Sequence, residues 1–340
     1  MFAPSIALEV WARNEIELVP YFQDGYRYRL EAKKLMFDRI DCPNAIAMGT
    51  SMTEVAINDG TVAPYERATG DRSYSPMFAF ASPGTRPLAM LGIWRWLDAR
   101  GCHPKTLFIE VTPVIMNIDR GEDFERSFMD WRMQLDIPEE RFELADYDLR
   151  FRFDLATWWR SYAYRNREPI VHYLGAELGI AKPKPPIAMP MDGNLHVTTD
   201  KGLSGSALAA HYRTTRNTFL KREFKYRYTP SYATAILLIV EEAQAAGTKV
   251  VLHTPPVPEM FHEFMMMIDA TRPYCDFYDA ATARPDVHWY TEHRRQGVPT
   301  TQFSDWLHLN REGAIQYAAR LFAASTANTF PRDPGCRGRY

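Results

Sequence analysis

A serine that follows an apolar run and a histidine that follows an aspartate are the residues of this chain best suited to do chemistry. Ser51 comes directly after the stretch AIAMGT, and Asp305 and His308 lie in the stretch DWLH. A serine hydroxyl becomes a nucleophile when a histidine takes its proton and a carboxylate orients that histidine. The spacing lets Asp305 bond the Nδ1–H of His308 and leaves Nε2 for Ser51. Alternatively, Ser51 is the N-cap of the following helix, and Asp305 and His308 are an ordinary helix-entry pair.

An acyl-transfer reaction also needs hydrogen-bond donors for the negative charge that develops on the carbonyl oxygen. Ser51 sits at the predicted start of a helix, where backbone N–H groups have no intrahelical partner. Gly84 lies in the stretch Ser-Pro-Gly that ends a second apolar run. A glycine lets the backbone approach a ligand closely, so its N–H is a candidate oxyanion donor. The alternative for Gly84 is an ordinary Pro-Gly turn.

The elements that must position these residues follow from the hydrophobic pattern. Apolar runs predict strands at 44–48, 77–81, 106–111 and 249–253, with a weaker one at 287–290. Helical spacing predicts helices at 25–39, 87–99, 231–246 and 310–323. Short apolar strands that alternate with helices predict an α/β fold, a three-layer α/β/α sandwich with a mainly parallel five-stranded sheet. Ligands of such sheets bind outside the carboxyl ends of the strands, which is where Ser51 and Gly84 fall.

The composition limits the class of protein. A chain of 340 residues with 46% hydrophobic residues can form one sizeable globular core, and we predict a single domain over 1–340. The net charge of −2 argues against a nucleic-acid-binding protein. No apolar run approaches the roughly 20 residues of a membrane span, and the N-terminus lacks the pattern of a signal peptide. Residues 120–229 do not follow the strand–helix alternation and are predicted to form a mostly helical insertion or cap.

The cysteines and the absence of nucleotide-binding motifs indicate neither a compartment nor a cofactor. Cys42, Cys102, Cys275 and Cys336 are widely spaced, so they are either buried thiols or form up to two disulfides, which leaves the redox compartment open. The chain has no Gly-x-x-x-x-Gly-Lys loop and no Gly-x-Gly-x-x-Gly fingerprint, and the spacing of its histidines does not predict a metal site. We therefore predict neither a cofactor nor a metal.

Taken in order, these blocks resemble the SGNH, or GDSL-like, esterases and acyltransferases. Gly-Thr-Ser at 49–51 corresponds to the nucleophile block, Gly84 to the glycine of the second block, and the strand 106–111 to the third. The stretch DWLHLNREGAIQYAARL corresponds to the terminal block, whose aspartate and histidine are Asp305 and His308. The chain is most similar in look to the branch of the alginate O-acetylation and teichoic-acid D-alanylation proteins. The resemblance covers about residues 45–115 and 231–325 and implies an SGNH or flavodoxin-like sheet.

Two features of this sequence depart from the family pattern. Thr50 stands where the Gly-Asp-Ser motif has aspartate, which this branch tolerates. The third block reads EVTPVIMN and lacks Gly-x-Asn-Asp. Asn117 is the candidate for the missing side-chain donor. Without it, the oxyanion hole would rest on the N–H groups of Ser51 and Gly84.

The resemblance implies a serine-dependent acyl-ester hydrolase or O-acyltransferase that acts on an acylated carbohydrate, a polysaccharide or a small ester. It also implies an extracytoplasmic setting and membrane-anchored or multi-protein acylation machinery as partner. The alternative is a non-catalytic carbohydrate-binding or assembly protein with a degraded site. The missing third-block asparagine favours this alternative.

Overall fold

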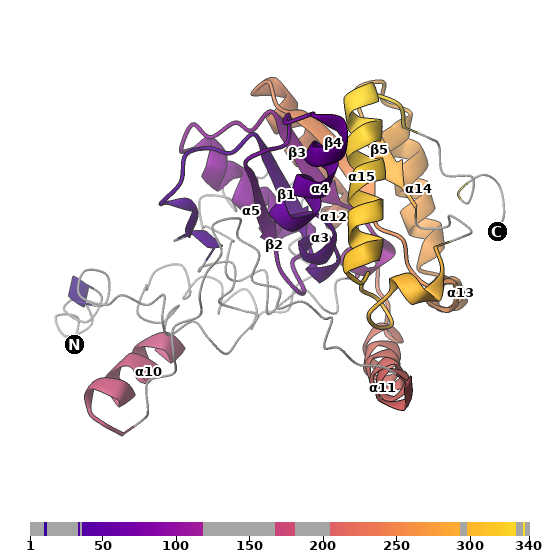
Figure 1. Cartoon of the computed structure of the whole chain (residues 1–340), viewed down its shortest axis with the longest axis horizontal. Coiled ribbons are helices and arrows are strands. Elements are labelled where there is room, and N and C mark those ends of the chain that lie inside the picture. The colour runs from indigo at the N-terminus through magenta and orange to yellow at the C-terminus, as the bar shows by residue number, and fades with distance from the viewer. Residues whose placement is uncertain are drawn as a thin grey trace.

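The computed structural model describes residues 10–11, 33–34, 36–117, 167–180, 205–292, 298–330 and 336, and its centre is a five-stranded sheet. The strands are β1 (Ala45–Gly49), β2 (Met77–Ala81), β3 (Thr106–Glu110), β4 (Lys249–Thr254) and β5 (His288–Thr291). All neighbouring strands are parallel, in the order β2-β1-β3-β4-β5 (Figure 1). The predicted α/β class and the parallel sheet are confirmed. In this order the chain changes direction across the sheet between β1 and β3, the point where such folds place their ligands.

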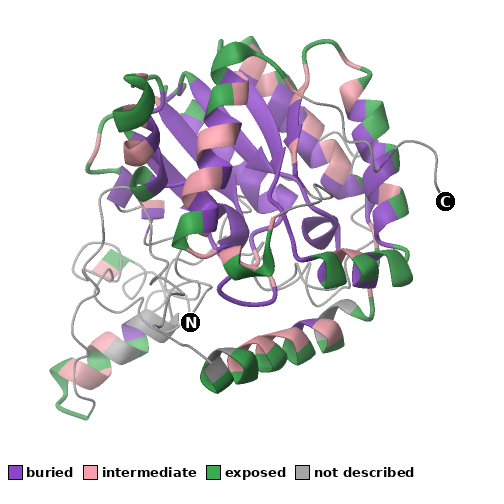
Figure 2. Ribbon diagram, turned by 45° about the vertical axis from the view of Figure 1, so that its right-hand side comes forward, coloured by how far each residue is buried: buried purple, intermediate pink, exposed green. Residues whose placement is uncertain are grey.

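Helices cover both faces of the sheet, which is why its strands read as continuous apolar runs. Every residue of β1, β2 and β3 is buried (Figure 2). Successive residues of β3 enter different cores, because side chains alternate across a strand. Leu107 and Ile109 belong to the core with α5 (Pro87–Asp98), α12 (Pro230–Ala245) and α14 (Thr271–Thr282). Phe108 belongs to the core with α4 (Asp59–Thr69) and α15 (Arg311–Ala327).

The remaining helices lie around the carboxyl ends of the strands or beyond the sheet. α3 (Ser51–Ala56) follows β1 directly, and two short 3₁₀ helices are Pro113–Met116 and Thr300–Gln302. α11 (Gly205–Glu223) and α13 (Glu259–Met267) contribute to a third apolar cluster. α10 (Arg167–Glu177) lies away from the sheet in both views (Figures 1 and 2).

Most boundaries agree with the sequence pattern to within a few residues. The predicted helix at 25–39 falls largely outside the described residues. The predicted helix start at Ser51 is confirmed as α3, which has only six residues. The sequence pattern did not predict α4, which contains Pro64, nor α13 or α14. Of the predicted insertion at 120–229, the described parts are 167–180 and 205–229. The single domain and the insertion stay predictions.

Two disulfides decide the question that the cysteine spacing left open. Cys42 bonds Cys102, which joins the segment before β1 to the segment before β3. Cys275 on α14 bonds Cys336 near the end of the chain. All four cysteines are therefore paired. Among the described helices, none is long and apolar enough to cross a membrane.

Candidate active site

The turn after β1 presents Ser51 at the first position of α3. Thr50, and not Ser51, is the N-cap, and its Oγ1 accepts the N–H of Met52 at 3.2 Å. The alternative interpretation of Ser51 as the helix cap is therefore wrong. Since Thr50 satisfies the helix start, the Ser51 hydroxyl is left for another partner. Ser51 is 8% exposed, at the carboxyl edge of the sheet.

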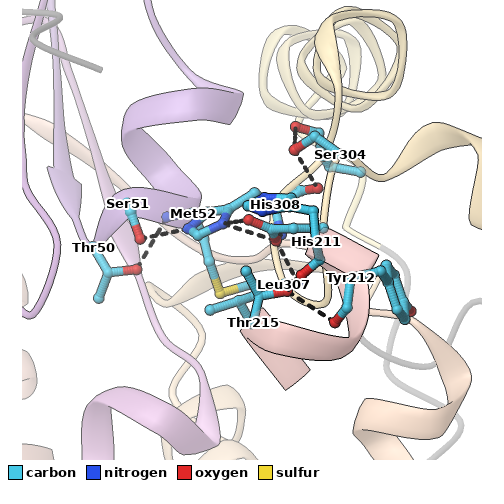
Figure 3. A network of polar contacts seen from close by, with 11 residues as sticks. Thr50, Ser51, Met52, His211, Tyr212, Thr215, Ser304, Leu307 and His308 are labelled. Carbon is cyan, nitrogen blue, oxygen red and sulfur yellow. Dashed lines mark hydrogen bonds and ion pairs between the residues drawn. The ribbon is translucent and has the colours of Figure 1, made fainter. Parts of the chain in front are cut away.

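That partner is His308, which lies on the turn before α15. His308 Nε2 is 2.7 Å from Ser51 Oγ, although the two residues are far apart in the chain (Figure 3). His308 Nδ1 lies 2.8 Å from Asp305 Oδ2 and 3.0 Å from Oδ1. A carboxylate only accepts, so Nδ1 carries the proton and Nε2 is free to accept from the serine hydroxyl. The structure thus brings Ser51, His308 and Asp305 into one chain of hydrogen bonds.

Asp305 is fixed by its own turn. Its Oδ1 accepts the N–H groups of Leu307 and His308, both at 2.8 Å. Burial by itself raises the pKa of the Asp305 carboxyl, but the charge of His308 and the bonds from its ring and from the two N–H groups outweigh burial and lower the pKa to about 2. Asp305 is therefore an anion at neutral pH, as a group that orients a histidine and stabilises its positive charge must be.

The backbone N–H groups of Ser51 and Gly84 are two candidate oxyanion donors at the carboxyl edge of the sheet. Ser51 N–H precedes the first intrahelical bond of α3, which runs from Glu54 N to the Thr50 carbonyl. Gly84 has a φ of 83°, a left-handed conformation that suits glycine. Within the described part of the chain, neither the Ser51 N–H nor the Gly84 N–H has an acceptor. Both are free to bind a developing oxyanion.

Asn117, the third predicted donor, has a structural partner. It is fully buried, and its Oδ1 accepts the N–H of Arg227 at 3.1 Å. Its backbone also forms an antiparallel bridge with Tyr228, so it joins the end of the β3 connection to the segment before α12. The contribution of Asn117 to an oxyanion hole stays a prediction.

Glu110, which ends β3 next to the serine turn, is a residue of the site that the sequence pattern did not predict. Glu110 is fully buried, and its Oε2 accepts the N–H of Thr50 at 2.8 Å and the N–H and hydroxyl of Thr53 at 3.2 and 2.6 Å. The Thr50 hydroxyl bonds both carboxylate oxygens, at 2.8 and 2.9 Å. Two of the first N–H groups of α3 therefore have acceptors. The Thr53 N–H donates to Glu110, and the Met52 N–H donates to Thr50 Oγ1. Ser51 N–H is the one left over.

Gly49 is required by the same contact. A Cβ at position 49 would lie 2.3 Å from Thr53 Oγ1 and 2.7 Å from Glu110 Cβ. The glycine of the Gly-Thr-Ser block therefore lets β3 and α3 approach across β1 closely enough for Glu110 to reach Thr53. A glutamate inside the apolar stretch TLFIEV was the available signal, because a lone acid in a buried strand must have donors around it.

A further buried chain links this carboxylate to α15. Thr53 Oγ1 lies 3.3 Å from His253 Nε2, and His253 Nδ1 lies 3.0 Å from the Tyr317 hydroxyl. Burial lowers the pKa of His253 to about 3, so its ring is neutral at ordinary pH. Because Thr53 donates to Glu110, it accepts from Nε2–H, and Nδ1 accepts from Tyr317. Tyr317 lies on the helix that begins just after His308, so the serine turn and the histidine turn share one polar network.

Apolar side chains border the triad on its other side. Met52, Trp306, Phe219 and Phe261 belong to one buried cluster built by α3, the turn of Asp305, α11 and α13. Tyr212 of α11 packs on Trp306 with ring centroids 5.6 Å apart, and Figure 3 shows Tyr212 near Leu307, the neighbour of His308. Burial, and next the negative charge of Asp305, raises the pKa of Tyr212. α11 therefore lies over the triad, and the described residues include no cluster of three or more His, Cys, Asp or Glu side chains that could hold a metal.

Comparison with known proteins finds solved structures of remote similarity. No protein-family model matches the chain, and no curated protein matches its sequence. A solved structure of a protein assigned as an acylhydrolase, from Bacteroides fragilis, is 11% identical with a TM-score of 0.41, over 88% of this chain and 97% of its own. A GDSL-like lipase from Bacteroides thetaiotaomicron is 12% identical with a TM-score of 0.41, over 89% and 100%. Similarity this low carries no argument about activity, which rests on the geometry of this chain.

Proposed function

We propose that this protein is a serine-dependent acyl-ester hydrolase or O-acyltransferase in which Ser51 is the nucleophile. The observation that carries the proposal is the 2.7 Å contact between Ser51 Oγ and His308 Nε2, with Asp305 bonded to Nδ1 of the same ring. In this proposal His308 acts first as base and then as acid, and Asp305 orients it. Ser51 N–H and Gly84 N–H bind the oxyanion.

The reaction follows from these positions. His308 Nε2 takes the hydroxyl proton while Ser51 Oγ attacks the acyl carbonyl carbon, and the carbonyl π electrons move onto the oxygen. The tetrahedral intermediate collapses, the ester C–O bond breaks, and His308 returns the proton to the leaving alkoxide. Water or a second hydroxyl then attacks the acyl-serine by the same steps. A positioned base contributes roughly 10²–10⁴-fold in rate, and each oxyanion donor about 10²-fold or more.

The substrate and setting belong to the finer part of the proposal. The resemblance to polysaccharide-modifying acyltransferases supports an acylated carbohydrate as substrate and membrane-anchored or multi-protein acylation machinery as partner. The two disulfides support an oxidising, extracytoplasmic compartment, because cytosolic thiols are kept reduced. The aromatic stretch at 150–167, which would suit stacking on sugar rings, lies almost wholly outside the described residues.

A fluorophosphonate label mapped by mass spectrometry tests the nucleophile directly. We expect labelling at Ser51 in the wild-type protein, none in Ser51→Ala, and unchanged labelling in Ser73→Ala, a serine on an exposed loop. Turnover of p-nitrophenyl acetate should follow the same order. Equal turnover by wild type and Ser51→Ala would remove Ser51 from the mechanism. An unlabelled, inactive wild type would favour the non-catalytic carbohydrate-binding alternative.

A second measurement separates hydrolysis from transfer. The acyl-serine is the common intermediate, so the two activities differ only in which hydroxyl attacks it. Turnover of p-nitrophenyl acetate with and without an added oligosaccharide, followed by mass spectrometry of the sugar, reports the acceptor. Acetylated sugar identifies a transferase, and free acetate alone identifies a hydrolase.

A further inference from the structure

The loop after β2 carries an arginine that is buried without a partner. Arg86 is 1% exposed, and its Nε and Nη1 atoms are buried with no hydrogen-bond partner. Lys33 bonds the carbonyl of Ala81 at the start of this loop, and it has a carboxylate of its own, Glu54, at 2.7 Å. No ion pair involves Arg86 in the described part of the chain. An unpaired buried charge is strongly unfavourable. We therefore expect Arg86 to bind an acceptor that the described residues do not supply.

The first turn of α5 adds backbone donors next to this arginine. The helix has no side-chain cap, and its first main-chain bond runs from Met90 N to the Arg86 carbonyl. Pro87 has no N–H, so Leu88 and Ala89 hold the unsatisfied N–H groups of the helix start. Both residues are buried, at 1% and 0% exposed, and neither N–H has an acceptor among the described residues. The start of a helix carries partial positive charge and favours anions.

Ser82 completes the set. It is 1% exposed, and its Oγ has no hydrogen-bond partner. The unpaired groups of residues 82–89 are therefore a guanidinium, a hydroxyl and two backbone N–H groups, all of which can donate. What this set lacks is an acceptor with more than one oxygen. A carboxylate or a phosphate has that chemistry, and it matches the fork of a guanidinium.

The position of the loop relates it to the proposed nucleophile. Ser82 N–H donates to the carbonyl of Gly49 at 3.0 Å, so the loop lies beside the strand end that leads into Ser51. Gly84, the proposed oxyanion donor, lies within the same loop. A molecule bound at the serine turn would therefore lie close to the loop that carries Arg86.

We propose that Ser82, Arg86 and the first turn of α5 form a subsite for an oxyanion group, a carboxylate or a phosphate, of the substrate. The subsite itself is argued from its own unpaired donors. The assignment of its ligand to the substrate rests on the proposed acyl-transfer function.

Thermal unfolding with and without added anion tests the subsite. In phosphate-free buffer of low ionic strength, Arg86→Met should melt at or above the wild-type Tm, because it removes an unpaired buried charge. Phosphate or acetate should raise the wild-type Tm by binding the folded state and should leave the variant unchanged. The matched control is Arg95→Met on the same helix, whose guanidinium pairs with Glu242 at 2.6 Å. This control should melt lower and keep the anion response.

The outcomes separate the ligands and the reasons for failure. A response to phosphate alone identifies a phosphate group, and a response to acetate alone identifies a carboxylate; both support the subsite. No response in wild type, or an equal response in Arg86→Met, would overturn it. If Arg86→Met does not fold, Arg86→Lys keeps the charge and loses the fork, and it should show a weaker response than wild type.

A pair of esters tests whether the anion belongs to the substrate. Phenyl acetate is neutral and 3-acetoxybenzoate carries a carboxylate on the leaving group. Arg86→Met should lower kcat/KM for the anionic ester at least about tenfold more than for the neutral one. Equal losses on both would place Arg86 at the oxyanion and overturn the assignment to the substrate. If wild type turns over neither ester while the anion response still depends on Arg86, the acyl-transfer function fails and the subsite stands.

Discussion

Glu110→Gln is the substitution that most directly tests how the serine turn is held. The carboxylate accepts two N–H groups and two hydroxyls from Thr50 and Thr53, at distances between 2.6 and 3.2 Å. Glutamine has nearly the same shape, so it changes the charge and one acceptor without leaving a cavity. Its carbonyl oxygen can take the place of Oε2, and its amide nitrogen must then face Thr50 Oγ1.

The expected loss follows from the bonds that remain. A hydrogen bond to a charged group contributes about 1.5–3 kcal/mol and a neutral one about 0.5–1.5 kcal/mol. Three donors bond Oε2 alone, namely Thr50 N and the N and Oγ1 of Thr53, and the Thr50 hydroxyl is shared between the two oxygens. If each bond weakens by about 1 kcal/mol, Glu110→Gln should lower the free energy of unfolding by about 3 kcal/mol. Glu110→Ala should lower it further, because it leaves these buried donors without an acceptor.

Urea unfolding followed by tryptophan fluorescence measures this loss. Glu242→Gln is the matched control, because its partly exposed pair with Arg95 should contribute less than about 1 kcal/mol. The rate of fluorophosphonate labelling of the folded protein should also fall about tenfold or more in Glu110→Gln, because the turn that aims Ser51 loses its anchor. A Glu110→Gln protein within about 0.5 kcal/mol of wild type and labelled at the wild-type rate would show that the Glu110 carboxylate does not hold the serine turn.

Three other predictions follow from the same site. The pKa of His253 in the folded state is about 3, well below its value in an unfolded chain. The contribution of His253 to the free energy of unfolding is therefore complete above about pH 6.5. It is lost as the pH falls toward 3, at about 1.4 kcal/mol per pH unit. Urea midpoints between pH 4.5 and 6.5 should show this slope in wild type and not in His253→Gln; parallel slopes would contradict it. Gly49→Ala should destabilise the fold by about 3 kcal/mol in the same assay, because its Cβ would lie 2.6 Å from Thr53 Cβ, and a near-wild-type midpoint would argue against the close approach of β3 and α3. Asp305→Asn should lower kcat on p-nitrophenyl acetate by about 10⁴-fold with little change in KM, because an amide favours the wrong tautomer of His308; a loss below about tenfold would deny Asp305 its orienting role.

The local parts of this protein can be predicted from its amino-acid sequence. Buried strands can be predicted because both faces of a parallel sheet are covered, so each strand is a continuous apolar run. β2 begins and ends where its apolar run does. The pairing of Asp305 with His308 can also be predicted, because it too depends on local sequence. The two residues are three positions apart on one turn, and a bond of that kind depends on local backbone geometry alone.

Which strand ends lie side by side depends on the packing of the complete fold. The order of parallel strands leaves no trace in hydrophobic periodicity, and it is this order that makes β3 the neighbour of β1 and brings Glu110 to Thr50. The disulfide partners were open for the same reason, because four cysteines allow three pairings. The contact of Ser51 with His308 spans most of the chain and exists because α15 packs against α3 and shares one face of the sheet with β1. The sequence could list the reacting groups, but only packing of the whole sheet sets the distances between groups that local geometry does not join.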